Sequence, residues 1–283
     1  MTFGATVLDV LVFGGTHGNE WTGVYAVERF AEQLRKEFPE LSCEFHFSNP
    51  EAFKLNKRFK DEDLNRAFQF LAEERPRSYE HNRAREIRTL IGRRPCFVID
   101  LHTTTANMGN TVILTNYHPL NLWVAAQLTQ RLPSCRVIGS PDDQKKYLAS
   151  QSEFGMMIEV GPVANGVVNG KALEGTLEVL RGIFAALSNQ EKFSSGRITL
   201  FEETSDIYYP KNDQGELDGY IHPEFQSKDF IPVNGNYTPF KKFSGEEISL
   251  STTEELYPIF INEAAYYPQQ LAFSLCRKVS KNF

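Results

Sequence analysis

Two histidines and a glutamate occupy positions from which side chains can converge on a metal ion. His17 and Glu20 lie in the glycine-rich segment 14–20, which follows an apolar run and precedes a helical pattern. His102 ends a second apolar run, residues 97–102. Two imidazoles and a carboxylate are a common ligand set for catalytic zinc, which keeps its fourth position for water. We therefore predict a metal site formed by these three residues.

Two further carboxylates are candidates for supporting roles. Asp100 lies two residues before His102 and hence on the same face of the predicted strand. It could accept a hydrogen bond from the imidazole and fix its tautomer, or it could cap a neighbouring loop. Glu159 interrupts an apolar strand, where burying a carboxylate costs free energy unless a partner compensates for it. It is a candidate general acid/base that activates the attacking water; the alternative is a structural salt bridge to an arginine.

The segments around these residues alternate between strand-like apolar runs and helical patterns. Such alternation predicts an α/β fold with a mostly parallel mixed sheet flanked by helices, and ligands then gather beyond the carboxyl ends of the strands. Strands are predicted at residues 5–13, 43–47, 97–101, 112–115, 136–138 and 156–161. Helices are predicted at residues 20–38, 79–91, 121–132 and 173–187.

The pattern changes after about residue 193. Short alternating segments separated by Asn- and Gly-containing turns are typical of a small, mainly antiparallel β domain. These segments are residues 197–201, 219–222, 239–243, 247–250 and 256–262. We therefore divide the chain into a catalytic domain, residues 1–193, and a β-rich domain, residues 194–283.

Composition narrows the functional classes. The chain has 283 residues, of which 41% are apolar and 23% charged, a balance typical of a soluble globular protein. Its net charge of -6 argues against a nucleic-acid binder. The four cysteines lack CxxC spacing and favour reduced thiols, and the N-terminal apolar run is too short to span a bilayer. We expect a cytoplasmic protein that binds neither nucleic acid nor membrane.

Five motifs together resemble the aspartoacylase family, which is grouped with the succinylglutamate desuccinylases in the zinc carboxypeptidase-like superfamily. In chain order they are GGTHGNE at 14–20, DLNR at 63–66, DLHTTTANMG at 100–109, IEVGP at 158–162 and NEAAYY at 262–267. They extend over essentially the whole chain. The resemblance implies the zinc carboxypeptidase-like fold, one zinc ion per chain, and a β domain that covers the catalytic cleft.

The resemblance also implies a role for individual residues. The three metal candidates fall on the zinc ligands, and Glu159 falls on the general acid/base. Arg58 falls on the arginine that polarises the scissile carbonyl and stabilises the oxyanion. Asn65 and Arg66 fall on the pair that binds the α-carboxylate of the substrate, assisted by Tyr266. A guanidinium suits this role because it can hold a carboxylate through two parallel hydrogen bonds.

The resemblance implies removal of the acyl group, acetyl by default, from a small-molecule N-acyl amino acid. It also implies N-acyl-L-aspartate as the default substrate and a homodimer as the assembly. One substrate-binding position departs from the family pattern. The arginine expected four residues after Tyr147 is Gln151, and the lysine expected after the last motif is absent. Deacylation of N-acyl aromatic or neutral amino acids is therefore one alternative, and desuccinylation is another. The distant alternative is a non-catalytic binding protein with the same fold.

Overall fold

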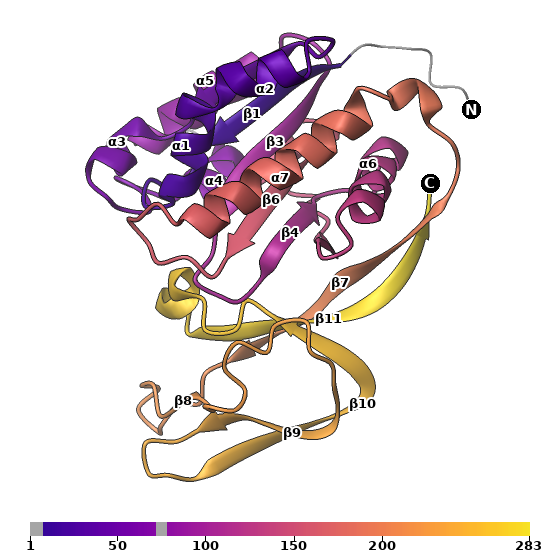
Figure 1. Cartoon of the computed structure of the whole chain (residues 1–283). Helices are drawn as coiled ribbons and strands as arrows, with labels where there is room; N and C mark the ends of the chain where they lie inside the picture. Colours follow the sequence, from indigo (N-terminus) through magenta and orange to yellow (C-terminus); the bar gives the residue numbers. More distant parts are fainter. Residues whose placement is uncertain (1–7, 72–77) are drawn as a thin grey trace.

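Residues 8–71 and 78–283 are described by a computed structural model, in which a single sheet runs through the molecule (Figure 1). The strand order in this sheet is β2-β1-β3-β6-β4-β5-β7-β11-β10-β9-β8. The strands are β1 (Asp9–Gly14), β2 (Cys43–Phe47), β3 (Cys96–Thr103), β4 (Gly109–Leu114), β5 (Arg136–Gly139), β6 (Phe154–Gly161), β7 (Arg197–Tyr208), β8 (Tyr220–Ile221), β9 (Val233–Lys241), β10 (Glu247–Ile259) and β11 (Leu271–Asn282).

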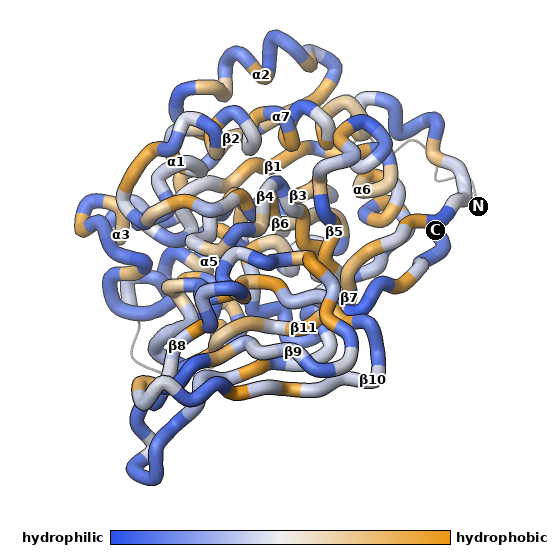
Figure 2. Tube along the Cα trace, turned by 60° about the horizontal axis from the view of Figure 1, so that its bottom comes forward, coloured by the Kyte–Doolittle hydropathy of each residue, from blue (hydrophilic) through white to orange (hydrophobic). Residues whose placement is uncertain are grey.

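Helices cover both faces of the N-terminal part of the sheet. They are α1 (Trp21–Arg29), α2 (Ala31–Glu37), α3 (Pro50–Lys54), α4 (Leu64–Ala67), α5 (Tyr79–Ile91), α6 (Pro119–Arg131) and α7 (Gly170–Leu187). Alternate residues of β1 face different cores, as expected for a strand buried on both sides. Val10 and Val12 pack with α1, α6 and α7, whereas Leu11 and Phe13 pack with α4 and α5. Figure 2 shows the resulting hydrophobic character along β1.

The predicted α/β class is confirmed, and the strand direction reverses once between β6 and β4, so that β4, β5 and β7 run opposite to β1, β2, β3 and β6. Strands β1, β2, β3 and β6 are parallel, but β4 runs antiparallel to β6. The helix predicted at residues 20–38 divides at Phe30, which is the C-cap of α1 and the N-cap of α2 and packs its ring against the core. Of the first predicted strand, residues 5–7 lie outside the described part of the chain.

The C-terminal part is antiparallel, as predicted, but its strands are longer. The segments predicted at 247–250 and 256–262 form one strand, β10, whose pairing with β9 is interrupted by register shifts. Strand β11 was not predicted and pairs with β7 along its whole length. Because β7 also pairs with β5, the sheet continues from one predicted domain into the other. The boundary near residue 193 stays a prediction.

No helix within residues 8–71 and 78–283 is long and apolar enough to cross a membrane.

Close contact between β1 and α1 fixes the loop that carries His17. Gly14 ends β1, and a Cβ atom on it would lie 2.1 Å from the carbonyl oxygen of Gly23 in α1. We expect Gly14→Ala to reduce the free energy of unfolding by about 1–3 kcal/mol, since the helix must move away from the strand. Urea denaturation would measure this. Gly170→Ala is the matched control, because a Cβ atom there meets nothing within 4 Å; equal losses in both variants would contradict the prediction.

Candidate metal centre and active site

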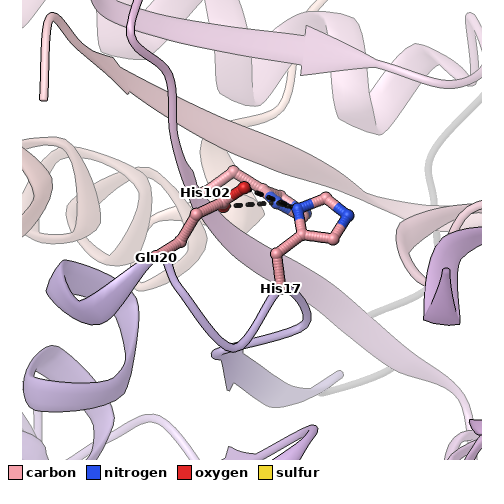
Figure 3. A group of neighbouring side chains, drawn as sticks. All are labelled: His17, Glu20 and His102. Carbon is pink, nitrogen blue, oxygen red and sulfur yellow. Dashed lines mark hydrogen bonds and ion pairs between the residues drawn. The ribbon is translucent and has the colours of Figure 1, made fainter. Parts of the chain in front are cut away.

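The three predicted metal ligands come from the ends of two neighbouring strands. His17 follows β1, Glu20 immediately precedes α1, and His102 lies near the end of β3. Since β1 and β3 are parallel neighbours in the sheet, their carboxyl ends meet at one edge. All three side chains are buried and point toward one another (Figure 3). The sequence therefore correctly predicted their convergence.

The distances between the donor atoms suit a divalent metal ion. His17 Nδ1 lies 2.6 Å from Glu20 Oε1 and 3.2 Å from His102 Nδ1, and His102 Nδ1 lies 3.0 Å from Glu20 Oε2. Donors around a tetrahedral ion with bonds of about 2.0–2.1 Å are about 3.3 Å apart. Two buried ring nitrogens that face each other across such a gap repel one another unless a proton or a cation lies between them. The donor set therefore fits a metal ion.

A carboxylate faces the opposite nitrogen of each imidazole, and the one at His102 is hydrogen-bonded to it. Asp100 Oδ2 lies 2.7 Å from His102 Nε2, and its other oxygen accepts a hydrogen bond from the Thr16 hydroxyl at 2.6 Å. Asp63 Oδ1 lies 3.4 Å from His17 Nε2. A carboxylate at Nε2 keeps the proton there and leaves Nδ1 free to bind a metal. Asp100 thus lies where it was predicted to act. Asp63 was not singled out, although it begins the DLNR motif.

The surroundings lower the pKa of one carboxyl group of this cluster and raise that of the other. Burial would raise the pKa of Glu20, but His17 and His102 outweigh it and hold that pKa well below its usual range. Burial would lower the pKa of His102, but Asp100 and Glu20 raise it well above its usual value. Burial raises the pKa of Glu159 well above its usual value, although His102 opposes the shift. Glu20 is therefore suited to hold a cation, and Glu159 to exchange a proton.

We expect Asp100→Asn to weaken zinc binding by about 10- to 100-fold, the usual cost of removing a carboxylate behind a ligating imidazole. The variant keeps the shape of the side chain but loses the charge that orients His102 Nε2. Competition with a chelating dye would measure the affinity, with Asp143→Asn, an exposed residue outside the site, as the control. Unchanged affinity in Asp100→Asn would show that Asp100 serves only the fold.

Glu159 lies next to His102 across the sheet. The two residues are register partners on the parallel strands β6 and β3, so their side chains project from the same face. Within residues 8–71 and 78–283, no hydrogen bond or ion pair to the Glu159 carboxylate is formed, which argues against the structural salt bridge considered from the sequence. Both residues line one pocket with a volume of about 90 Å³.

Most of the sequence-predicted site residues line this pocket. They are His17, Glu20, Arg58, Asn65, Arg66, His102, Tyr147, Glu159 and Tyr266. Asp100 lies behind His102, and Gln151 does not line the pocket. The Gln151 amide instead donates hydrogen bonds to the backbone carbonyls of Lys145 and Tyr147, at 2.6 Å and 2.9 Å. The Gln151 side chain therefore holds the turn that presents Tyr147. It does not reach the pocket, so its predicted role in substrate binding stays a prediction.

The two arginines of the pocket differ in their partners. The Arg58 guanidinium donates to Asp63 Oδ2 at 3.0 Å and lies 3.6 Å from Glu20 Oε1, beside the metal ligands. Arg66 lies over the ring of Tyr147, 5.2 Å from its centroid. In the described part of the chain Arg66 makes no hydrogen bond or ion pair. Its guanidinium is thus available for a bound carboxylate, whereas that of Arg58 is already engaged.

Several pocket residues were not predicted from the sequence. Glu263 is buried and accepts hydrogen bonds from the Thr104 hydroxyl and from the backbone and hydroxyl groups of Thr105, the latter two at 2.7 Å and 2.9 Å. It thereby ties the segment before Tyr266 to the loop after His102. Its place in the NEAAYY motif was the available signal. Ser140 and Glu203 also line the pocket, and no motif marks either of them.

Together, the mixed sheet, its two helical layers and the antiparallel C-terminal strands define a zinc carboxypeptidase-like fold. The sequence matches the succinylglutamate desuccinylase/aspartoacylase catalytic domain over residues 6–187 and the barrel-sandwich hybrid domain of the same family over residues 196–278. The chain therefore belongs to the succinylglutamate desuccinylase/aspartoacylase family.

Individual relatives agree with this assignment over nearly their full length. A probable aspartoacylase of Trichodesmium erythraeum is 36% identical, covering 95% of this chain and 96% of that protein. An N-acyl-aromatic-L-amino acid amidohydrolase (carboxylate-forming) of Xenopus tropicalis is 34% identical, covering 96% and 93%. The crystal structure of murine aminoacylase 3 superposes with a TM-score of 0.90 at 31% identity, covering 98% of this chain and 97% of that one.

Proposed function

We propose that this protein is a zinc-dependent amidohydrolase that removes the acyl group from an N-acyl amino acid. The acyl group that we propose is acetyl. One observation carries the proposal: two imidazole Nδ1 atoms and the Glu20 carboxylate converge beside Glu159, whose carboxylate has no partner in the described chain. The names of the relatives, which include aspartoacylases and N-acyl-aromatic-L-amino acid amidohydrolases, support the same reaction class. We assign one zinc ion per chain to His17, Glu20 and His102.

The zinc ion, when bound, polarises a carbonyl group and makes a water molecule more acidic. Glu159 then carries the proton through the reaction. Its carboxylate accepts a proton from the attacking water, and the resulting carboxylic acid donates that proton to the leaving amine. Burial favours this exchange because it brings the pKa of Glu159 up toward the working range of a group that must both take and give a proton.

The remaining pocket residues bind different groups of the substrate. Arg58, beside Glu20, is placed to stabilise negative charge on the oxygen of the scissile carbonyl, a role typically worth about 3–4 kcal/mol of the barrier. Arg66, whose guanidinium has no hydrogen bond or ion pair among the described residues, is placed to bind the α-carboxylate, with Asn65 and Tyr266 in the same lining. A pocket of about 90 Å³ lies below the usual size range of ligand pockets and is too small for a folded polypeptide.

Two classes of amino acid are candidates for the released product. Aspartate is the first, because several relatives are named aspartoacylase or probable aspartoacylase. Neutral or aromatic amino acids are the second. They are favoured by the apolar part of the lining, which includes Ile113, Met157 and Phe260, and by the name of the Xenopus relatives. A homodimeric assembly stays a prediction from the family resemblance, and a cytoplasmic location stays a prediction from the composition.

A panel of N-acetyl-L-amino acids tests the proposed reaction. The panel should include aspartate, asparagine, leucine and phenylalanine derivatives, and the assay should follow both the released amine and the released acetate. We expect zinc-loaded protein to release the two products in equal amounts from at least one member. Release no faster than in a Glu159→Gln preparation for every member would refute the proposed function.

A further inference from the structure

A carboxylate that the proposed mechanism does not use lies in the wall of the active-site pocket. Glu203 is on β7, and Ser140 directly follows β5, the strand that pairs with β7. The Ser140 hydroxyl donates a hydrogen bond to Glu203 Oε2 at 2.6 Å. Both residues line the same pocket as the metal ligands. The hydrogen bond therefore holds the Glu203 carboxyl group at the pocket wall.

Glu203 lines the pocket from β7, whereas the metal ligands lie at the ends of β1 and β3. In the sheet, β6, β4 and β5 separate β3, which carries His102, from β7. Tyr266 lines the same pocket. Burial raises the pKa of its hydroxyl, and the Glu159 and Glu203 carboxylates add to that effect, so this hydroxyl is within electrostatic range of both. In the proposed mechanism the scissile carbonyl lies at the metal ligands, so Glu203, on β7, faces substrate atoms beyond that carbonyl.

Among residues 8–71 and 78–283, the cations that line the pocket do not provide a partner for a second substrate carboxylate. Arg58 is already paired with Asp63 and lies beside Glu20. Arg66 can bind one carboxylate, and in the proposed mechanism this is the α-carboxylate. Lys146 attracts Glu203 electrostatically, but it lies over the Tyr147 ring, 5.0 Å from its centroid, and does not line the pocket.

We propose that Glu203, held by Ser140, is a specificity-determining residue that disfavours substrates with a carboxylate in the amino-acid side chain and favours neutral side chains that can donate a hydrogen bond. The inference rests on the proposed function and refines it. A side-chain carboxylate in this pocket meets a like charge, and like charges brought together in a binding site are strongly unfavourable. A side-chain amide of the same shape instead donates to the Glu203 oxygen.

Pairs of substrates that differ in charge but hardly in shape test this proposal. The kcat/KM values of zinc-loaded enzyme are compared for N-acetyl-L-asparagine against N-acetyl-L-aspartate, and for N-acetyl-L-glutamine against N-acetyl-L-glutamate. We expect a preference for the amide of about tenfold or more. Glu203→Gln should reduce that preference by about tenfold, mainly by raising kcat/KM for the acidic members. Asp206→Asn removes the same charge from β7 outside the pocket lining and should leave the preference unchanged.

The outcomes separate this inference from the proposed function. If the wild type hydrolyses the panel but prefers the acidic member of each pair, or if Glu203→Gln changes the preference by less than twofold, the inference is wrong and the amidohydrolase remains. An effect of Glu203→Gln confined to the acyl group, seen with N-succinyl against N-acetyl derivatives of one amino acid, also overturns it. If no N-acyl amino acid is hydrolysed, both proposals fail.

Discussion

Glu159→Gln is expected to reduce kcat for hydrolysis of an N-acyl amino acid by about 1,000-fold, in the range typical of a lost general acid/base. The glutamine keeps the shape of the side chain but cannot accept a proton from water or return one to the amine. Because Glu159 is not one of the three converging donors, zinc content should stay at one ion per chain. Loss of activity with retention of metal is the combination that distinguishes proton transfer from metal binding.

The pH profile gives a second readout for the same variant. Burial raises the pKa of Glu159, and a general base must be ionised at the start of the reaction. Activity of the wild type should therefore fall as the pH drops through that raised pKa, and this acidic limb should be missing from the residual activity of Glu159→Gln. Glu153→Gln, an exposed residue outside the pocket, is the control. A Glu159→Gln variant with more than a tenth of the wild-type kcat would contradict the assigned role.

His102→Ala is expected to lose both the metal and the activity. One ligand of three is removed, and the buried Glu20 and Asp100 carboxylates lose the imidazole that lies between them. We expect zinc content to fall below about a tenth of an ion per chain and kcat to fall by at least about 1,000-fold, since water activation and carbonyl polarisation depend on the metal. Zinc analysis after metal-replete purification would measure the first effect.

The control for this variant must separate metal loss from unfolding. His222→Gln changes a half-buried histidine of the C-terminal part, hydrogen-bonded to the Glu224 backbone, that is outside the pocket. It should keep full zinc content. Circular dichroism of His102→Ala should show that its helices and strands persist. A folded His102→Ala variant that still carries one zinc ion per chain would contradict the ligand assignment.

The sequence was sufficient to predict the centre of the site. His17 and His102 each follow an apolar run, and parallel strands in an α/β sheet present such residues at one edge. Strand β2 and helix α5 have the bounds expected from their patterns. These features depend on local periodicity, on short motifs and on one general rule about strand ends, all of which a single sequence contains.

The rest of the site depends on contacts between segments that are distant in the sequence. The bond between Thr104 and Glu263 joins residues 159 positions apart, and the pairing of Ser140 with Glu203 depends on β5 and β7 being neighbours. Periodicity does not specify strand order, so neither contact could be predicted. Strand β11 was missed for a related reason. Its second half is largely exposed and carries charged residues, so it lacks an apolar run and is fixed by its pairing with β7.

Zinc titration of the metal-free protein tests the central claim most directly. The metal would be removed with a chelator, zinc returned in measured steps, and hydrolysis of the most active N-acetyl amino acid followed at each step. The proposed site predicts that activity rises in proportion to added zinc and reaches its maximum at one ion per chain. Full activity in the metal-free protein, or a folded wild type that binds less than a tenth of an ion per chain, would contradict it.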